Sequence, residues 1–298
     1  MSQTAPDPQS AFKTPEDEAR FRAAYDAVLA EWPVPFEELN IPTRLGATHV
    51  IASGPVDAPP VLLLSALAGT ATAWRLNAAG LSAHHRIYAV DVIGQPGKSA
   101  VPPLIRNRRQ FAEWITDLLD ALGVARVSIV GCSFGGFLAL SQASLTPERV
   151  ERIVLISPVG GFASQYWKLS YLMRVKRPLI KVMSRFAFFR RAQAKNSTPP
   201  TPPRDLKWAA LMGVMMAVRP KINVTRAPSF STAELRAIRP RALLLIGDQE
   251  RVYDPPAMLK LAQERMPGLS VALVPGADHV AAMAQPDEVN ARIIEFLR

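Results

Sequence analysis

The sequence predicts an α/β protein with a mostly parallel, twisted sheet and helices on both faces. Three observations lead to this prediction. Short apolar, β-branched runs recur along the chain, amphipathic helical patterns lie between most of them, and 298 residues with 49% hydrophobic content suffice for a sizeable core. Alternation of strands and helices is typical of a parallel sheet that is covered on both faces.

Seven apolar runs are predicted as strands, and the helices are predicted from their 3.6-residue periodicity. The run at 61–65 is continuous and apolar, which is typical of a strand buried on both faces. In chain order the predicted strands cover residues 48–53, 61–65, 86–90, 126–130, 152–157, 242–246 and 270–274. The predicted helices of the core cover residues 111–122, 137–143, 258–265 and 286–298.

The first 40 residues are expected to form an N-terminal arm and a helix. Residues 1–13 are expected to be disordered. A helix is predicted to begin after Thr14, a favourable N-cap, with Pro15 at its first position. Five apolar side chains share one face at helical spacing, so we expect this helix to dock on the core. They are Phe21, Tyr25, Val28, Leu29 and Trp32.

Residues 161–240 interrupt the alternation and are predicted to form a basic helical cap, or lid, inserted between the two parts of the core, 41–160 and 241–298. The segment from Gly161 to Arg241 holds 17 Lys or Arg residues and two acidic residues, a net charge of +15 against +10 for the whole chain. The stretch from Ser197 to Pro203 is rich in proline, which is typical of a stiff connector.

The apolar side of the cap is expected to pack over a pocket, with the basic residues in solvent. Six apolar residues recur at spacings of three and four: Leu172, Val175, Leu179, Val182, Phe186 and Phe189. Five methionines add soft apolar surface, which either lines an acyl or aromatic substrate site or fills the core of the cap. They are Met173, Met183, Met212, Met215 and Met216. A second interpretation is a basic amphipathic surface that binds anionic lipid or an acidic protein.

Charge, targeting signals and metal-binding residue types narrow the function class. The basicity is confined to the cap, which argues against a nucleic-acid binder. The N-terminus has no apolar secretory segment and no run of about 18 apolar residues exists, so a cytoplasmic location is expected. A single cysteine excludes an intrachain disulfide, and four histidines leave little room for a metal site. His49 is expected to be a packing residue on a strand, and His84 and His85 are expected at the surface.

The most informative motif is Gly131-Cys132-Ser133-Phe134-Gly135, which follows a predicted strand and precedes a helical pattern. A strand, a sharp turn and a helix are the context that a G-x-S-x-G nucleophile elbow requires. The turn lifts the Ser133 hydroxyl above the sheet, and the Phe134 backbone N–H is predicted to face a developing oxyanion. The alternative is a glycine-rich turn with an incidental serine. Cys132 is expected to be a small buried filler.

A nucleophilic serine needs a general base, and the base needs a carboxylate to orient it. His279 is the only histidine after Ser133 and follows the last predicted strand, so it is the candidate base. The alternative is an exposed loop residue. Three carboxylates follow the strand at 242–246 and compete for the role of the acid: Asp248, Glu250 and Asp254.

With these motifs, residues 43–298 resemble the α/β-hydrolase superfamily. The stretch Asp91–Ser99 resembles the family's D-x-x-G-x-G-x-S pattern, although it is one residue longer, and the loop around His279 resembles the family's histidine loop. In the family the acid usually stands three residues after the glycine that ends its strand. The resemblance therefore implies Glu250 as the acid, ahead of the two aspartates. The alternative pairs Glu250 with Arg251 at the surface.

A departure from the family concerns the oxyanion loop. Many members carry His-Gly directly after the third strand of the fold, whereas residues 65–69 of this chain read Ser-Ala-Leu-Ala-Gly. The oxyanion hole uses backbone N–H groups, so the change of side chains need not abolish it. By position the resemblance implies Leu67 as the second donor beside Phe134. The alternative is that Leu67 is a core residue.

The resemblance implies a serine hydrolase that cleaves a carboxylic ester or a related acyl compound through a Ser-His-Glu/Asp triad and an acyl-enzyme. It implies no metal and no organic cofactor, and a small-molecule substrate with an apolar acyl or aromatic group. Members of the same fold also hydrolyse carbon–carbon bonds of diketones, cleave thioesters or act as cofactor-free haloperoxidases. A non-catalytic small-molecule-binding protein and an adaptor acting through the basic cap are the alternatives outside these enzyme classes.

Overall fold

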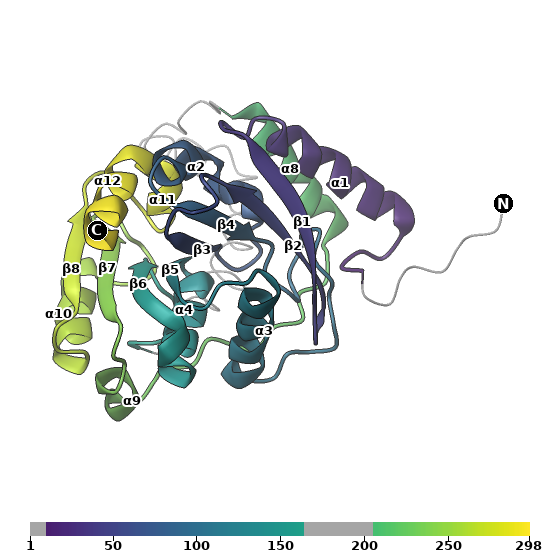
Figure 1. Ribbon diagram of the computed structural model, residues 1–298. Coiled ribbons are helices and arrows are strands. Elements are labelled where there is room, and N and C mark those ends of the chain that lie inside the picture. Colours follow the sequence, from purple (N-terminus) through teal and green to yellow (C-terminus); the bar gives the residue numbers. More distant parts are fainter. Residues whose placement is uncertain (1–9, 164–204) are drawn as a thin grey trace, which may run out of the picture.

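Eight strands form one sheet at the centre of the molecule (Figure 1). The structure is a computed structural model, and it describes residues 10–163 and 205–298. The strand order is β1-β2-β4-β3-β5-β6-β7-β8; all pairings from β4 to β8 are parallel, and β2 pairs antiparallel with β1 and β4. The strands are β1 Phe36–Thr43, β2 Gly46–Ser53, β3 Pro60–Leu64, β4 Arg86–Val90, β5 Val127–Cys132, β6 Val150–Ile156, β7 Arg241–Gly247 and β8 Ser270–Val274.

All seven predicted strands are present, and the prediction of an α/β fold with a mostly parallel sheet is confirmed. The bounds predicted for β4 and β8 agree at both ends. Strand β1 is not predicted by the sequence pattern, because its residues are exposed or half-buried and Pro42 lies within it. It pairs only with β2, and an edge strand needs no continuous apolar run.

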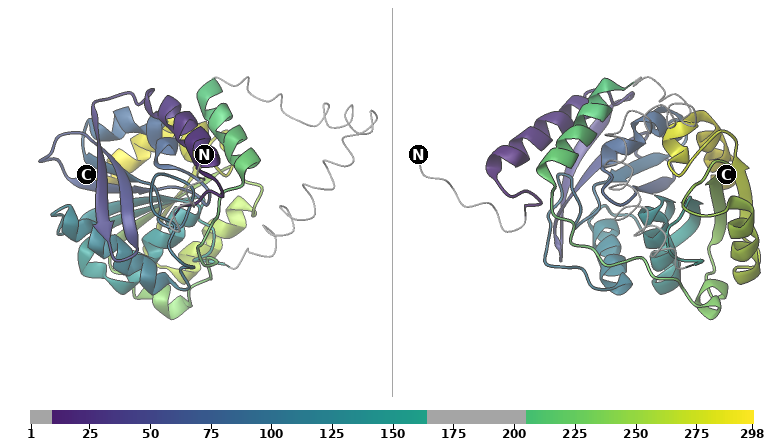
Figure 2. Two further views of the ribbon diagram at one scale, coloured as in Figure 1. Left: turned by 90° about the vertical axis from the view of Figure 1, so that its right-hand side faces the viewer. Right: turned by 180° about the vertical axis from the view of Figure 1, so that it is seen from behind.

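Helices cover both faces of the sheet (Figures 1 and 2). One face packs against α3, α4, α9 and α10, and the other packs against α1, α2, α8, α11 and α12. Among the described residues no helix is long and apolar enough to cross a lipid bilayer. The helices are α1 Pro15–Leu29, η1 Ala71–Trp74, α2 Arg75–Ser82, α3 Arg108–Ala121, α4 Phe134–Leu145, η2 Pro147–Arg149, α8 Leu206–Val218, α9 Thr232–Arg236, α10 Pro255–Arg265, α11 Ala281–Ala284 and α12 Pro286–Leu297.

The N-terminal helix α1 begins where its cap predicts. The Thr14 side chain accepts a hydrogen bond from the backbone N–H of Asp17, and Pro15 occupies the first turn, where it needs no hydrogen-bond donor. The five apolar side chains predicted to face the core are all buried. Residues 10–13 differ from the expectation of disorder, because Ala11 and Phe12 are buried beside this helix.

Of the predicted cap, 161–240, the structure describes residues 161–163 and 205–240, and these pack on both faces of the sheet: α8 packs on α1, whereas α9 packs against α10 on the other face. Helix α8 lies beside α1 (Figures 1 and 2), and the Lys207 ammonium pairs with Glu31 at 2.9 Å. Met215 is buried, whereas Met216 is 78% exposed. The other predictions for the cap lie outside the described residues; they concern Leu172, Val175, Leu179, Val182, Phe186, Phe189, Met173, Met183 and the stretch from Ser197 to Pro203.

A charged cluster, in which His49 and Asp91 are buried and Glu38 is exposed, joins the edge of the sheet to the loop after β4. His49 on β2 contacts Asp91 through Nδ1 at 3.0 Å and Glu38 through Nε2 at 2.8 Å, and Lys98 Nζ lies 2.6 Å from Glu38. Burial acts to lower the pKa of His49, but the hydrogen bonds to the two carboxylates outweigh it and raise this pKa above its ordinary value.

The surface position expected for His85 is wrong, since it is buried.

The raised pKa of His49 predicts a pH-dependent stability. A group with a raised folded-state pKa stabilises the fold fully below its unfolded pKa of about 6.5, and this contribution is lost as the pH rises through the folded value. The stability difference between wild type and His49→Gln should therefore shrink from about pH 6 to about pH 9. Urea unfolding over this range measures it, with the exposed His84→Gln as control. A constant difference between wild type and His49→Gln would contradict the prediction.

Candidate active site

Ser133 lies in a strained turn between β5 and α4. Its backbone has φ 53° and ψ −109°, outside the regions that a serine ordinarily adopts. The neighbours two positions away must lack a Cβ atom: one at Gly131 would lie 2.2 Å from the carbonyl oxygen of Gly135, and one at Gly135 would lie 2.1 Å from that of Leu64. The glycines thus permit the close approach that raises Ser133 at the carboxyl end of the sheet.

His279 reaches Ser133 from the loop after β8. Its Nε2 lies 3.0 Å from the Ser133 hydroxyl oxygen, and its Nδ1 lies 2.6 Å from Oε2 of Glu250. An ionised carboxylate only accepts hydrogen bonds, so Nδ1 carries the proton and Nε2 is free to accept one from the serine. The structure therefore brings the predicted nucleophile, base and acid together in one chain of hydrogen bonds.

Glu250 is a buried carboxylate that accepts hydrogen bonds from His279 and from two backbone N–H groups. Its Oε1 accepts hydrogen bonds from the backbone N–H groups of Arg251 and Val252, both at 2.8 Å, while Oε2 faces His279. Burial acts to raise the pKa of Glu250, but the hydrogen bond to His279, its charge and the two backbone donors outweigh this and lower the pKa. The carboxylate is ionised at neutral pH, as a partner for an imidazolium must be.

The two other candidate acids accept hydrogen bonds from backbone N–H groups. Asp248 accepts a hydrogen bond from the Gly276 N–H at 2.9 Å and so braces the loop that carries His279. Asp254 caps α10 by accepting from the Ala257 N–H at 2.8 Å. The alternative that pairs Glu250 with Arg251 at the surface does not hold, because the side chain of Glu250 is fully buried and bonds to the backbone N–H of Arg251, not to its side chain.

Two backbone donors border the serine. Leu67 and Phe134 line one cavity with Ser133, of about 130 Å³, and neither backbone N–H donates a hydrogen bond to another described residue. Phe134 is the first residue of α4, where backbone N–H groups have no partner within the helix. The alternative that Leu67 is a core residue is wrong, since it is 47% exposed.

Leu67 also lines a second cavity, of about 170 Å³. Its walls come from residues 65–69, from η1, from α8 and from the segment that follows His279, and they are mainly apolar. Trp74 and Trp208 contribute to it, as do Met212, Val280 and Met283. The hydroxyl of Ser65 and the indole N–H of Trp74 are buried without a hydrogen-bond partner in the described structure.

Sequence reasoning missed most of the residues that line these cavities. Ile222, Val224 and Ala227 border the Ser133 cavity, and the two tryptophans border the other. No motif marks them, because a cavity wall needs only apolar side chains that the tertiary structure brings together. For Trp208, Ile222, Val224 and Ala227 the one available signal was their place in the predicted cap, and Trp74 had none.

Cys132, adjacent to Ser133, is a free, buried thiol. Burial and the negative charge of Glu250 raise its pKa to about 12. The thiol therefore stays protonated at neutral pH and is a poor nucleophile. It lines the 170 Å³ cavity as a small apolar group, as expected for a filler at the elbow.

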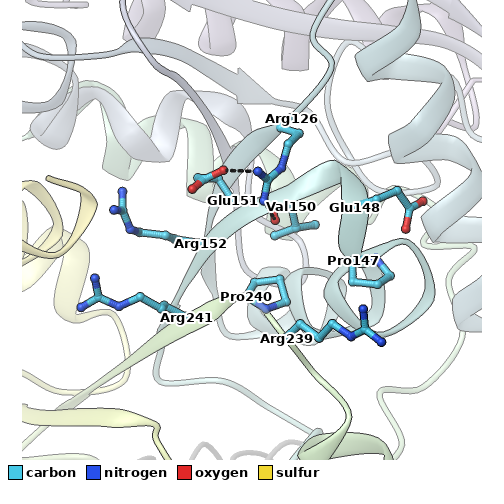
Figure 3. A pocket seen from close by; sticks show the side chains of 9 residues that line it. All are labelled: Arg126, Pro147, Glu148, Val150, Glu151, Arg152, Arg239, Pro240 and Arg241. Atoms are coloured by element: carbon cyan, nitrogen blue, oxygen red, sulfur yellow. Dashed lines mark hydrogen bonds and ion pairs between the residues drawn. The ribbon is translucent and has the colours of Figure 1, made fainter.

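A third hollow, of about 380 Å³, lies at the opposite end of the strands (Figure 3). It opens where β6 and β7 begin, whereas Ser133 and Glu250 follow strand ends. Arginine side chains surround it, and Arg126 pairs with Glu151 at 2.9 Å (Figure 3). None of the predicted site residues lines this hollow, so it is separate from the Ser133 site.

Comparison with known proteins extends the likeness to the whole chain. A match to the alpha/beta hydrolase family covers residues 61–292. Carboxylesterase YbfK of Bacillus subtilis is 32% identical over 286 residues, which cover 96% of this chain and 96% of that protein. An uncharacterized carboxylesterase, nap, of the same organism is 32% identical over 281 residues, 93% of this chain and 92% of that protein.

Solved structures agree with the sequence comparison. The crystal structure of naproxen esterase (carboxylesterase NP) from Bacillus subtilis has a TM-score of 0.79 and 30% identity, covering 95% of this chain and 99% of that one. The crystal structure of carboxylesterase CesB (YbfK) from Bacillus subtilis has a TM-score of 0.78 and 32% identity, covering 95% and 98%. Fold, motifs and nearly full-length relatives together show that this chain belongs to the α/β-hydrolase family.

Proposed function

We propose that this protein is a carboxylesterase in which Ser133, His279 and Glu250 act as a catalytic triad. The observation that carries the proposal is the pair of hydrogen bonds, 2.6 Å and 3.0 Å long, that links Glu250 to His279 and His279 to Ser133. Relatives that match over nearly their whole length are named as carboxylesterases, which supports ester hydrolysis over other chemistry of the fold.

In the first half of the reaction, the Ser133 hydroxyl attacks the ester carbonyl while His279 Nε2 takes its proton. The carbonyl oxygen becomes an oxyanion, which the Leu67 and Phe134 N–H groups stabilise, since neither donates to an acceptor within residues 10–163 and 205–298. Glu250 stabilises the imidazolium that forms. His279 then returns the proton to the leaving alkoxide, so that an alcohol departs and the acyl group remains on Ser133.

In the second half, a water molecule replaces the alcohol. His279 takes a proton from the water as it attacks the acyl carbonyl, and the same two N–H groups hold the second oxyanion. The ester bond to Ser133 breaks, the serine recovers its proton from His279, and the carboxylic acid is released.

The apolar cavity beside Leu67 supports a substrate with an apolar acyl or aromatic group. An apolar cavity of roughly 150 Å³ accepts benzene, and this one measures about 170 Å³. A phenyl ring or a short branched alkyl group therefore fits. We infer that α8, within the cap assigned to residues 161–240, forms part of this substrate site through Trp208 and Met212.

Ser133→Ala tests the nucleophile. Wild type should react with a fluorophosphonate probe and hydrolyse short and medium p-nitrophenyl esters, and the variant should lose both, with kcat/KM reduced roughly 10⁴-fold or more. Ser141→Ala, which removes a buried hydroxyl on α4 that bonds only to the Phe137 carbonyl, is the control and should remain active. A folded wild type that is neither labelled nor active would overturn the proposal and favour a binding protein.

Glu250→Gln tests the acid. The variant keeps the size of the side chain but removes the charge that stabilises the imidazolium, so kcat should fall on the order of 10⁴-fold. The loss should persist from about pH 5 to about pH 9, because the lowered pKa of Glu250 keeps the wild-type carboxylate ionised in that range. Asp254→Asn is the matched control and should keep kcat. A larger loss of kcat in Asp254→Asn than in Glu250→Gln would show that Glu250 is not the acid.

Met212 tests the substrate cavity. Met212→Trp should narrow the cavity, and Met212→Ala should widen it. The measured quantity is kcat/KM for an ester with a phenyl-sized group divided by kcat/KM for an ester with a two-carbon group. This ratio should fall about tenfold in Met212→Trp and rise in Met212→Ala. The group is varied separately in the acyl and alcohol parts. Met216→Trp, on the exposed side of α8, is the control. Unchanged ratios in both series would place the apolar group elsewhere.

A further inference from the structure

The segment that carries Leu67 lacks regular secondary structure. It connects β3 to η1, and a tight turn within it is closed by a hydrogen bond from the Gly69 N–H to the Ala66 carbonyl at 2.8 Å. Ala68 has φ +61°, in the left-handed region that residues other than glycine seldom adopt. Such a conformation persists only where the surroundings hold it, so contacts from outside the segment must maintain its shape.

Gln95 supplies one such contact. Its Oε1 accepts a hydrogen bond from the Ala68 N–H at 2.6 Å. The acceptor must be the amide oxygen, because an amide NH₂ facing an N–H would not form a bond. The side chain of Gln95 is fully buried, and its Nε2 has no hydrogen-bond partner among the described residues. Burying an amide with one end unpaired is costly, which points to a role for the end that is paired.

The position of Gln95 is itself fixed by the turn after β4. Its N–H donates to the Val92 carbonyl at 3.2 Å, and Gly94 has φ +78°. The Asn223 N–H donates to the Gly94 carbonyl at 2.8 Å, and a Cβ atom at Gly94 would lie 3.1 Å from the Asn223 carbonyl oxygen. Residues next to Asn223 line the Ser133 cavity, so this turn contacts both the loop that carries Leu67 and the segment that lines the same cavity from the other part of the chain.

The same stretch holds the loop at a second point. Asp91, at the start of the motif Asp91–Ser99, accepts a hydrogen bond from the Ala71 N–H at 2.7 Å. The additional residue that lengthens this motif falls between Gly94 and Gly97, in the pair that begins with Gln95. The Asp91–Ser99 motif and the loop at 65–69 both differ from the family pattern, and the hydrogen bond from the Ala68 N–H to Gln95 joins the two differing segments.

We propose that Gln95 is a positioning residue for the oxyanion hole, which it orients by holding the peptide group between Leu67 and Ala68. The inference rests on the proposed esterase function and adds to it a residue outside the triad and the hole. Because Gln95 fixes the peptide on one side of Leu67, it limits the directions in which the Leu67 N–H points. A donor set for the oxyanion acts on the transition state and leaves binding of the uncharged ester nearly unchanged.

Gln95→Met is the direct test, because it keeps the length of the side chain and removes the acceptor. We expect kcat to fall about tenfold with KM within about twofold, less than the 10²–10³ that follow loss of a donor itself. The affinity for an alkyl trifluoromethyl ketone, which adds to the serine and forms an oxyanion, should fall by the same factor as kcat/KM. A role in stability alone would leave that affinity unchanged in the folded variant.

Matched variants separate these outcomes. Gln142→Met makes the same change at another fully buried glutamine, on α4, whose amide bonds to Thr116, and it should keep kcat and inhibitor affinity. Gln95→Glu keeps an acceptor and should restore most of the activity. If Gln95→Met does not fold, Gln95→Asn retains the amide but withdraws it by one methylene, and it should show the same coupled loss to a smaller extent.

Unchanged kcat and inhibitor affinity in a folded Gln95→Met protein, or a rise in KM alone, would overturn the inference while leaving the esterase proposal intact. A wild type that neither hydrolyses esters nor binds the trifluoromethyl ketone would overturn both. Thermal unfolding of each variant identifies losses that come from unfolding.

Discussion

Backbone atoms of β3, β5 and α4 pack against one another at Ser133 so closely that Gly131 and Gly135 have no room for a side chain. This contact holds Ser133 in its strained conformation and presents its hydroxyl at the end of the sheet. It also places the first N–H of α4 beside the hydroxyl. The hydrogen bond that His279 Nε2 accepts from the Ser133 hydroxyl depends on a serine held in that place, as does the proposed use of Leu67 as an oxyanion donor.

The electrostatics of the site follow from one buried carboxylate. Glu250 is kept ionised by an imidazole and two backbone N–H groups, and its charge then acts on its surroundings. In the proposed mechanism this charge stabilises the imidazolium that forms when His279 takes a proton. It also disfavours the thiolate of Cys132, which is consistent with Ser133 rather than the adjacent thiol as the proposed nucleophile.

In the proposed oxyanion loop, residues 65–69, the side chains differ from those that many family members carry. Backbone N–H groups would bind the oxyanion in the proposed mechanism, so these side chains can vary as long as the backbone is held. In this chain the restraints come from the turn after β4, through Asp91 and Gln95. The same turn contacts the segment around Asn223, so the two walls of the Ser133 cavity share one support.

Seven strands, the elbow and the histidine were predictable from sequence because each leaves a local pattern: buried runs, small residues around a serine, and a histidine after the last strand. Strand β1 left none, since an edge strand is half exposed. The choice among Asp248, Glu250 and Asp254 was not local, because all three stand within one loop and only burial against His279 distinguishes them. The link from Gln95 to Ala68 joins residues 27 positions apart. A local pattern depends only on neighbouring residues in the sequence. A contact between residues distant in the sequence, such as Gln95 with Ala68, exists only once the strands before them lie side by side.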